Sequence, residues 1–321
     1  MVNRMKSVVC NALLVISLVL GGCGSESETI VNGVLESESL FFTEDGRLFV
    51  SGGNGVYEII QAVDGSYLKL DIFHENCLVE GIIQRYDYLY AVCSKLKPKE
   101  FFDSYLLAAR ISERAPVISD ITDDQVHPFM ELKVIHALDQ LGIPNGMEVD
   151  EFGNIYIADS GKNDIVQVRF SSPTEVEAID LWAENISFAV NGLEWVGDQL
   201  YYTGIKAGTL NSVMGRIQRN PDGSAGDSEI LYQRGATVLD DLVAYQQGVI
   251  VTDYLKGSLI YWREGEIVAE TPADTFFAPT AVAPAQQPMF DDSALVVTEK
   301  GIIFDDHVNL GNKVGLYYPE F

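Results

Sequence analysis

The stretch IPNGMEVDEFGNIYIADSGKNDIVQV, residues 143–168, carries the pattern that decides the fold of this 321-residue chain. A polar pair, Asn145–Gly146, is followed by apolar residues, an acidic turn with glycine, an alternating segment that closes in Ala-Asp, and a further turn and strand. Alternation of apolar and polar residues between short turn signals is typical of β-strands. The stretch therefore predicts antiparallel strands joined by tight turns.

The same pattern occurs six times, at intervals of about forty to fifty residues apart from one longer gap. The copies open at Glu38, Glu80, Asn145, Asn191, Asp240 and Thr280. Within the copy that opens at Asn145, the expected strands are GMEVD, NIYIAD, DIVQVRF and EVEAIDLW. A repeat of this length with four short strands is typical of one propeller blade. The sequence therefore predicts an all-β fold, a six-bladed β-propeller with four antiparallel strands per blade, spanning residues 30–321 as a single domain.

The longer gap falls at residues 95–134, which we interpret as an insertion in the second blade. Its segment YLLAARISERA looks helical and predicts a helix packed on the blade rim, with a lid over the channel as the alternative. A seven-bladed ring is the alternative if this insertion hides a blade. The ring also has to close, and residues 29–35 are expected to add an outer strand to the last blade beside residues 313–319.

The N-terminus has the features of a targeting segment, with two basic residues followed by a short apolar run. The sequence LGGC at residues 20–23 resembles a bacterial lipobox. We therefore expect residues 1–22 to be a lipoprotein signal peptide, Cys23 to be lipidated, and residues 23–29 to begin the mature chain as a tether. The expected location is the bacterial cell envelope, on the periplasmic face of the outer membrane or the cell surface. The alternative is an ordinary cleaved signal peptide.

Composition restricts the partners of this chain. Asp and Glu number 47 against 21 Lys and Arg, which gives a formal net charge of −26 and excludes nucleic acid as a favoured ligand. A cation is the better match, and we expect a monomer. In an oxidising compartment, Cys77 and Cys93 are predicted to form a disulfide, because they flank two strands joined by a turn. A Cys-x-x-Cys motif is absent, so a redox or zinc site is not expected.

The residues that open the six repeats are the candidate site. The first strand of each propeller blade lines the central channel, so these residues are expected to meet at one channel mouth. Carboxylate and amide oxygens that converge on an axis repel one another unless they share a cation. Oxygen ligands without His or Cys favour Ca²⁺.

Four of these residues also carry a family resemblance. Glu38 in ESLFFTEDG, Asn145 in PNGMEVD, Asn191 in NGLEWV and Asp240 in LDDLVAY resemble the metal ligands of calcium-dependent six-bladed propellers of the senescence-marker-protein/gluconolactonase superfamily. That group includes paraoxonases and strictosidine-synthase-like proteins. The resemblance implies a lactone or ester hydrolase with Ca²⁺ as Lewis acid, and with Asp240 as both ligand and nucleophile or general base.

The chain also departs from that family. Ile143 stands where sugar lactonases carry Arg, which argues against a sugar-acid lactone as substrate, and Gly146 stands where many members carry Asp. Further candidates belong to the expected substrate pocket or to proton transfer. They are Glu80, Asp241 and Thr280 in the pocket and His136 as a general base, with His127 of the insertion as a second histidine. Two other functions remain open: a non-catalytic propeller that binds a ligand or protein at the channel mouth, and a strictosidine-synthase-like or lyase-like chemistry.

Overall fold

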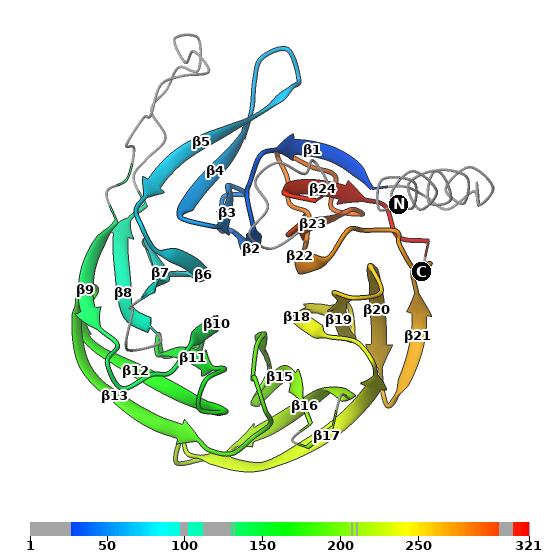
Figure 1. Cartoon of the computed structure of the whole chain (residues 1–321). Coiled ribbons are helices and arrows are strands. Elements are labelled where there is room, and N and C mark those ends of the chain that lie inside the picture. Colours follow the sequence, from blue (N-terminus) through cyan, green and yellow to red (C-terminus); the bar gives the residue numbers. More distant parts are fainter. Residues whose placement is uncertain are drawn as a thin grey trace, which may run out of the picture.

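The computed structural model describes residues 27–96, 102–111, 130, 132–206, 208–209, 211–301 and 311–320. In this part of the chain 24 strands form six four-stranded sheets. The sheets stand as blades around a central axis (Figure 1). Within each sheet, neighbouring strands pair antiparallel. The predicted six-bladed propeller is confirmed, and the seven-bladed alternative is wrong.

Each blade begins with its innermost strand and proceeds outward. Blade one consists of β2 (Ser37–Phe42), β3 (Leu48–Gly52), β4 (Gly55–Gln61) and β5 (Tyr67–His74). Blade two consists of β6 (Leu78–Arg85), β7 (Tyr88–Leu96), β8 (Phe102–Arg110) and β9 (Lys133–Ala137). Blade three consists of β10 (Pro144–Val149), β11 (Ile155–Asp159), β12 (Asp164–Ser172) and β13 (Glu175–Ala183).

The second half of the ring repeats this order. Blade four consists of β14 (Leu193–Val196), β15 (Gln199–Ile205), β16 (Asn211–Arg219) and β17 (Ala225–Gly235). Blade five consists of β18 (Leu239–Tyr245), β19 (Gly248–Asp253), β20 (Ser258–Arg263) and β21 (Glu266–Glu270). Blade six consists of β22 (Pro279–Pro284), β23 (Leu295–Glu299), β24 (Lys313–Tyr317) and, as its outermost strand, β1 (Glu28–Asn32).

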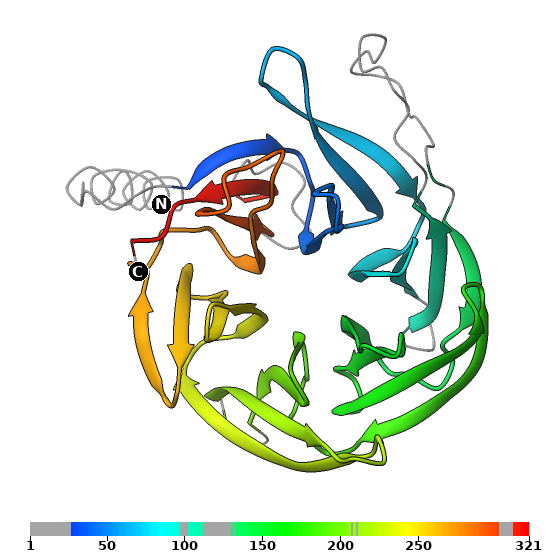
Figure 2. The ribbon, with the colours of Figure 1, turned by 180° about the vertical axis from the view of Figure 1, so that it is seen from behind.

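Blade six closes the ring by joining the two ends of the described chain. β1 pairs antiparallel with β24, with Thr29 opposite Gly315 and Asn32 opposite Lys313. Figures 1 and 2 both show β1, in blue, beside the red C-terminal strand. The predicted closure by residues 29–35 and 313–319 is therefore confirmed. β24, the third strand of blade six, thereby has a hydrogen-bonded strand on both sides.

Blade two corrects the interpretation of residues 95–134. The segment expected to be helical begins inside β8, which pairs with β7 along its whole length, for example Cys93 with Tyr105. Alternation along this strand buries Leu106 and Leu107 on opposite faces, and the apolar run made it look helical. The third strand of blade two thus lies inside the range that was taken as an insertion, and the fourth strand begins at the end of that range.

Among the described residues, six hydrophobic clusters form the core, one between each pair of neighbouring blades. Between blades three and four, for example, Tyr156 and Ile165 pack against Leu200 and Tyr202. Blades therefore bury their apolar faces against each other, and no blade is stable alone. The predicted disulfide between Cys77 and Cys93 is also present, with a Cα–Cα separation of 5.6 Å, and it joins the start of blade two to its second strand.

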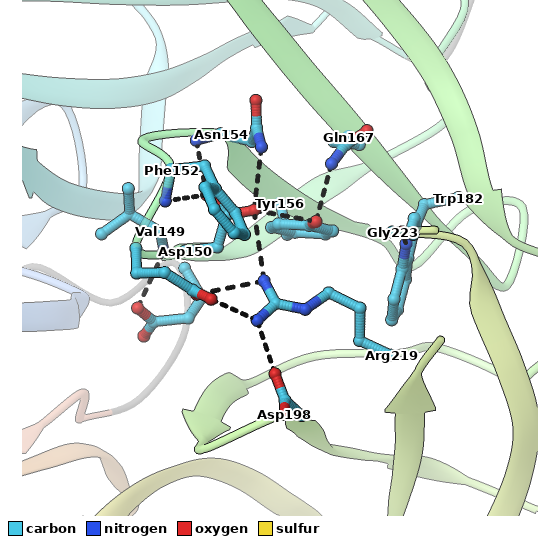
Figure 3. Close-up of polar contacts among 12 residues, drawn as sticks. Val149, Asp150, Phe152, Asn154, Tyr156, Gln167, Trp182, Asp198, Arg219 and Gly223 are labelled. Carbon is cyan, nitrogen blue, oxygen red and sulfur yellow. Dashed lines mark hydrogen bonds and ion pairs between the residues drawn. The ribbon is translucent and has the colours of Figure 1, made fainter. Parts of the chain in front are cut away.

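A second contact between blades three and four is polar (Figure 3). Arg219, at the end of β16, donates to Glu151 in the β10–β11 turn at 3.0 Å and to Asp198 at 2.7 Å. Its guanidinium carbon lies 5.0 Å from the ring centre of Trp195 and 5.2 Å from that of Phe152. The side chain is 7% exposed. Arg219 thus joins the turns of two blades by ion pairs and by stacking.

The predicted signal peptide and Cys23 lie outside the described residues, and so does most of the segment between β8 and β9. Across the part of the chain that the structure describes, no helix has the length and hydropathy that crossing a membrane requires.

Candidate functional site in the central channel

The innermost strands of all six blades line a central cavity of about 240 Å³. Its walls include four of the residues that open the repeats and were predicted as metal ligands: Glu38, Asn145, Asn191 and Asp240. Asp241 and Thr280, predicted for the pocket, line it as well. The sequence repeat therefore brings these residues together from different blades.

Hydroxyl groups hold the opening residues at fixed positions from the neighbouring blade. Ser51 on β3 donates to the carbonyl oxygen of Glu80 at 2.6 Å, and Thr203 on β15 donates to that of Asp240 at 2.5 Å. Thr252 on β19 donates to the carbonyl oxygen of Thr280 at 3.1 Å. These second-strand hydroxyls thus link the start of one innermost strand to the adjacent blade.

Thr280 itself is part of this linkage. Its hydroxyl donates to the carbonyl oxygen of Ser37 at 2.9 Å, which connects blade six to blade one, and it lies 2.8 Å from the hydroxyl of Thr298. The side chain is 1% exposed. The Thr280 hydroxyl is therefore engaged in the closure of the ring, and its role in substrate contact stays a prediction.

In the part of the chain that the structure describes, one cationic side chain, Lys300, lies among the carboxyls of the channel mouth. Lys300 forms an ion pair with Glu38, and its side chain is 16% exposed. Burial alone would lower the pKa of Lys300, but the negative charges of Glu38, Glu80 and Asp240 raise it above its ordinary value. Asn191 donates its amide NH₂ to Oδ1 of Asp240. Lys300 is therefore a permanently charged ammonium that neutralises part of this cluster.

The carboxyl groups around Lys300 have strongly raised pKa values. Burial raises the pKa of Glu80 to about 8, and the neighbouring charge of Glu38 adds to the effect. Burial also raises the pKa of Asp240 well above its ordinary value, again with a contribution from Glu38 that Lys300 partly offsets. A carboxyl group whose pKa lies near neutrality, as that of Glu80 does, can both accept and release a proton at physiological pH.

Lys300 was not predicted as a site residue, although its place directly after the second strand of blade six could have indicated that it lies near the channel. It follows Glu299, the last residue of β23, and an antiparallel second strand ends beside the start of the first strand. Glu299 is 1% exposed and accepts hydrogen bonds from Phe277 N at 2.6 Å and from Ser27 Oγ at 3.1 Å. Lys313 pairs with it at 3.1 Å. These contacts fix the end of β23 and direct the next residue to the channel mouth.

A second group of carboxyls was also missed, and it lies within the channel. Glu148 on β10 and Glu194 on β14 interact with each other, and Asp241 on β18 lies close to both. Burial raises the pKa of Glu194 to about 7 and that of Asp241 to about 8, and it raises that of Glu148 well above the ordinary range. Glu194 also accepts a hydrogen bond from Ala244 N at 3.0 Å. The alternation of β10 and β14 places Glu148 and Glu194 on the channel side.

The donor set does not fit the predicted calcium ion while Lys300 lies within it. One predicted ligand, Glu38, is paired with the Lys300 ammonium, and another, Asp240, accepts the amide NH₂ of Asn191. Asn191 thus presents its nitrogen to the cluster rather than its carbonyl oxygen. A divalent cation placed between these oxygens would lie next to a fixed positive charge. Across the described residues, no group of three or more His, Cys, Asp and Glu side chains is arranged to hold a metal ion.

The remaining predicted residues lie in different places. Glu80 lies near Glu38, whose charge adds to the rise that burial causes in the pKa of Glu80. His136 is on β9, the outermost strand of blade two, where it pairs with Leu106. The structure therefore does not bring His136 to the channel, because the fourth strand of a blade lies at the rim. His127 lies outside the described residues.

Solved structures with this fold include proteins of the predicted superfamily. A luciferin-regenerating enzyme superposes with a TM-score of 0.65 at 13% identity, covering 92% of this chain and 96% of its own. A calcium-binding regucalcin from Agrobacterium tumefaciens str. C58 gives 0.63 at 11% identity, covering 91% and 92%. A gluconolactonase from Xanthomonas campestris gives 0.56 at 13% identity, covering 94% and 99%. No protein-family model matches the sequence, and no curated protein does so either.

These likenesses establish the fold. The chain has the six-bladed architecture of regucalcin- and gluconolactonase-type propellers over nearly its whole length, which confirms the predicted resemblance at the level of the fold. At this identity, fold alone does not carry an activity, and the function has to be argued from the channel itself.

Proposed function

We propose that the protein is a hydrolase of small lactones or carboxylic esters that acts at the mouth of the central channel. The observation that carries the proposal is the convergence of Glu38, Asp240 and Lys300 beside a cavity of about 240 Å³. This volume is smaller than the 300–1,000 Å³ that is usual for pockets that enclose drug-sized ligands. The substrate is therefore a small molecule. The presence of a gluconolactonase among the structures that share the fold supports the same class of reaction.

The chemistry can be assigned to residues of this chain. The Lys300 ammonium is held by Glu38 and supplies a fixed positive charge that polarises a carbonyl group and stabilises the oxyanion that develops during attack. Asp240, oriented by the amide of Asn191, acts as nucleophile or as the base that activates water. Asn145 lines the opposite side of the cavity and is available to orient the substrate. Calcium was the expected source of positive charge, and it has no part in this scheme because Lys300 lies among its predicted ligands.

A panel of lactones and aryl esters tests the proposal, with hydrolysis followed by absorbance and proton release. Asp240→Asn is expected to lower kcat/KM by about 100-fold or more, which is typical of losing a general base. Asp180→Asn, on the exposed face of β13, is the matched control and is expected to leave activity unchanged. Circular dichroism confirms that both variants fold. Absence of turnover with every substrate, or full activity of Asp240→Asn, contradicts the proposal.

A non-catalytic binding propeller is the second candidate. Among the described residues, five carboxyl groups line the cavity, and Glu80 lies near Glu38, against the single ammonium of Lys300; the five are Glu38, Glu148, Glu194, Asp240 and Asp241. Such an excess favours a small cationic ligand. Saturable calorimetric binding of a small amine, without turnover of any ester, would favour this candidate over the hydrolase.

The anchor is a separate part of the proposal. The lipobox at residues 20–23 supports lipidation of Cys23 and attachment to the cell envelope. Because β1 begins at Glu28, the tether between lipid and propeller would be short, and the propeller would remain close to the membrane. Incorporation of an alkyne fatty acid in a bacterial host tests this. Cys23→Ala is expected to abolish labelling, whereas Cys10→Ala is expected to retain it.

A further inference from the structure

Lys300 is the one cationic side chain that the described residues place at the channel mouth. It follows β23 directly, and the hydrogen bonds and ion pair of Glu299 fix the end of that strand. The backbone N–H of Lys300 donates to the carbonyl oxygen of Ala278 at 3.0 Å. Its position is therefore set by the main chain and by a buried neighbour, and it is not that of a freely moving surface lysine.

The surroundings of Lys300 are those of a cation site. Glu38 pairs with its ammonium directly, and the charges of Glu80 and Asp240 act on it as well. These three carboxyls come from blades one, two and five, and blades one and five flank blade six, which carries Lys300. Without a positive charge between them, three buried carboxylates would repel one another at considerable cost.

We propose that Lys300 is the resident cation of the channel mouth and takes the place that a divalent metal ion would otherwise occupy among these oxygens. The inference concerns the same site as the proposed hydrolase, but it rests only on the ion pair, the burial and the convergence of the carboxyls. It follows that the wild-type channel does not bind Ca²⁺, and that removing the Lys300 side chain exposes an oxygen-rich site that does.

Calcium titration of the full-length chain, purified in detergent and freed of metal with a chelator, tests the proposal. Wild-type protein is expected to show no saturable heat up to about 10 mM Ca²⁺. Lys300→Ala is expected to bind one ion with a Kd of about 1 mM or tighter, a gain of at least about tenfold within the range of known protein sites. Its Tm is expected to rise with added Ca²⁺, while the Tm of the wild type does not change.

Three variants act as controls. Lys300→Arg keeps a cation in place and is expected to gain no binding. Lys162→Ala removes an exposed ammonium, and it is also expected to gain none. Adding Asp240→Asn to Lys300→Ala is expected to abolish the new site. Saturable binding of Ca²⁺ by the wild type below about 1 mM, or a folded Lys300→Ala chain that binds no ion, overturns the proposal.

A measurement on unaltered protein covers the case in which Lys300→Ala does not fold. Brief acetylation followed by mass spectrometry compares Lys300 with the exposed Lys162. Acetylation needs the unprotonated amine, and the negative charges around Lys300 raise its pKa, so Lys300 is expected to react at least about tenfold more slowly. Equal reactivity overturns the proposal. Neither experiment measures hydrolysis, so a failed substrate screen and a failed calcium test are distinguishable.

Discussion

Gly81, Gly146 and Gly192 each follow the residue that opens a sequence repeat, and they show how closely the blades approach at the axis. A Cβ added at Gly81 would lie 2.4 Å from the carbonyl oxygen of Asn145 in the next blade. At Gly146 it would lie 2.3 Å from the carbonyl oxygen of Asn191. The Asn-Gly pairs of this chain, which often mark turns, are therefore sites of close backbone approach.

A substitution at Gly146 tests this close approach. Gly146→Ala forces the backbone of Asn191 to move, and it is expected to lower the free energy of unfolding by about 1–3 kcal/mol, as overpacking does in cores. Gly315→Ala is the control, since its added Cβ would have no neighbour nearer than 3.4 Å. Urea denaturation measures both. Equal stability of the two variants would show that the blades can separate at the axis without cost.

The blades are held together by apolar clusters inside the ring and by polar contacts at its faces. The hydroxyls of Ser51, Thr203 and Thr252 act at the channel mouth, where they hold the carbonyl groups of the opening residues. Arg219 joins blades three and four through the turns that it contacts (Figure 3). Its position between two aromatic rings adds apolar contact to the ion pairs.

Arg219→Gln tests that contact. Asp150, whose side chain is 1% exposed, lies 3.6 Å from the guanidinium, so its charge loses a partner. The expected loss in the free energy of unfolding is about 3 kcal/mol, in the range for breaking a buried pair. Arg216→Gln is the matched control, because its pair with Glu229 is exposed and is expected to contribute less than about 1 kcal/mol. A similar loss in both variants, measured by chemical denaturation, would contradict the role assigned to Arg219.

The carboxyl groups of the channel make the free energy of unfolding depend on pH. The folded state raises the pKa of Glu194 from 4.5 to about 7, so folded protein binds more protons than unfolded protein between these values. Stability is therefore expected to fall as pH rises through this window. Thermal unfolding between pH 4 and pH 8 measures this.

Glu194→Gln isolates the effect of that carboxyl. The amide cannot ionise, so the variant is expected to be more stable than wild type at pH 8 by roughly 1–3 kcal/mol and little changed at pH 4. Glu177→Gln, on an exposed position of β13, is expected to change neither value. A wild-type chain whose stability increases steadily from pH 5 to pH 8, with no gain in Glu194→Gln, would contradict this account.

The sequence predicted the ring more completely than the chemistry inside it. Spacing and alternation identified six blades, the closing strand and the cysteine pair, because these depend on periodicity and neighbours along the chain. The opening residues were found for the same reason. Lys300, Glu148 and Glu194 were missed because they are not at repeat-opening positions, and their proximity to Glu38 and Asp241 arises only when the blades close. His136 was misplaced because the fourth strand of blade two, on which it lies, was not predicted.

The closure of blade six has a consequence for how the chain is made. The strand nearest the N-terminus pairs with the strand nearest the C-terminus, so β1 has no partner until almost the entire polypeptide has been synthesised. Five blades can assemble in order as they emerge, since each consists of consecutive strands. The sixth requires a contact across nearly the full sequence, and such distant pairings form slowly. Until then β1 is unpaired, and an unpaired strand edge can pair with another chain.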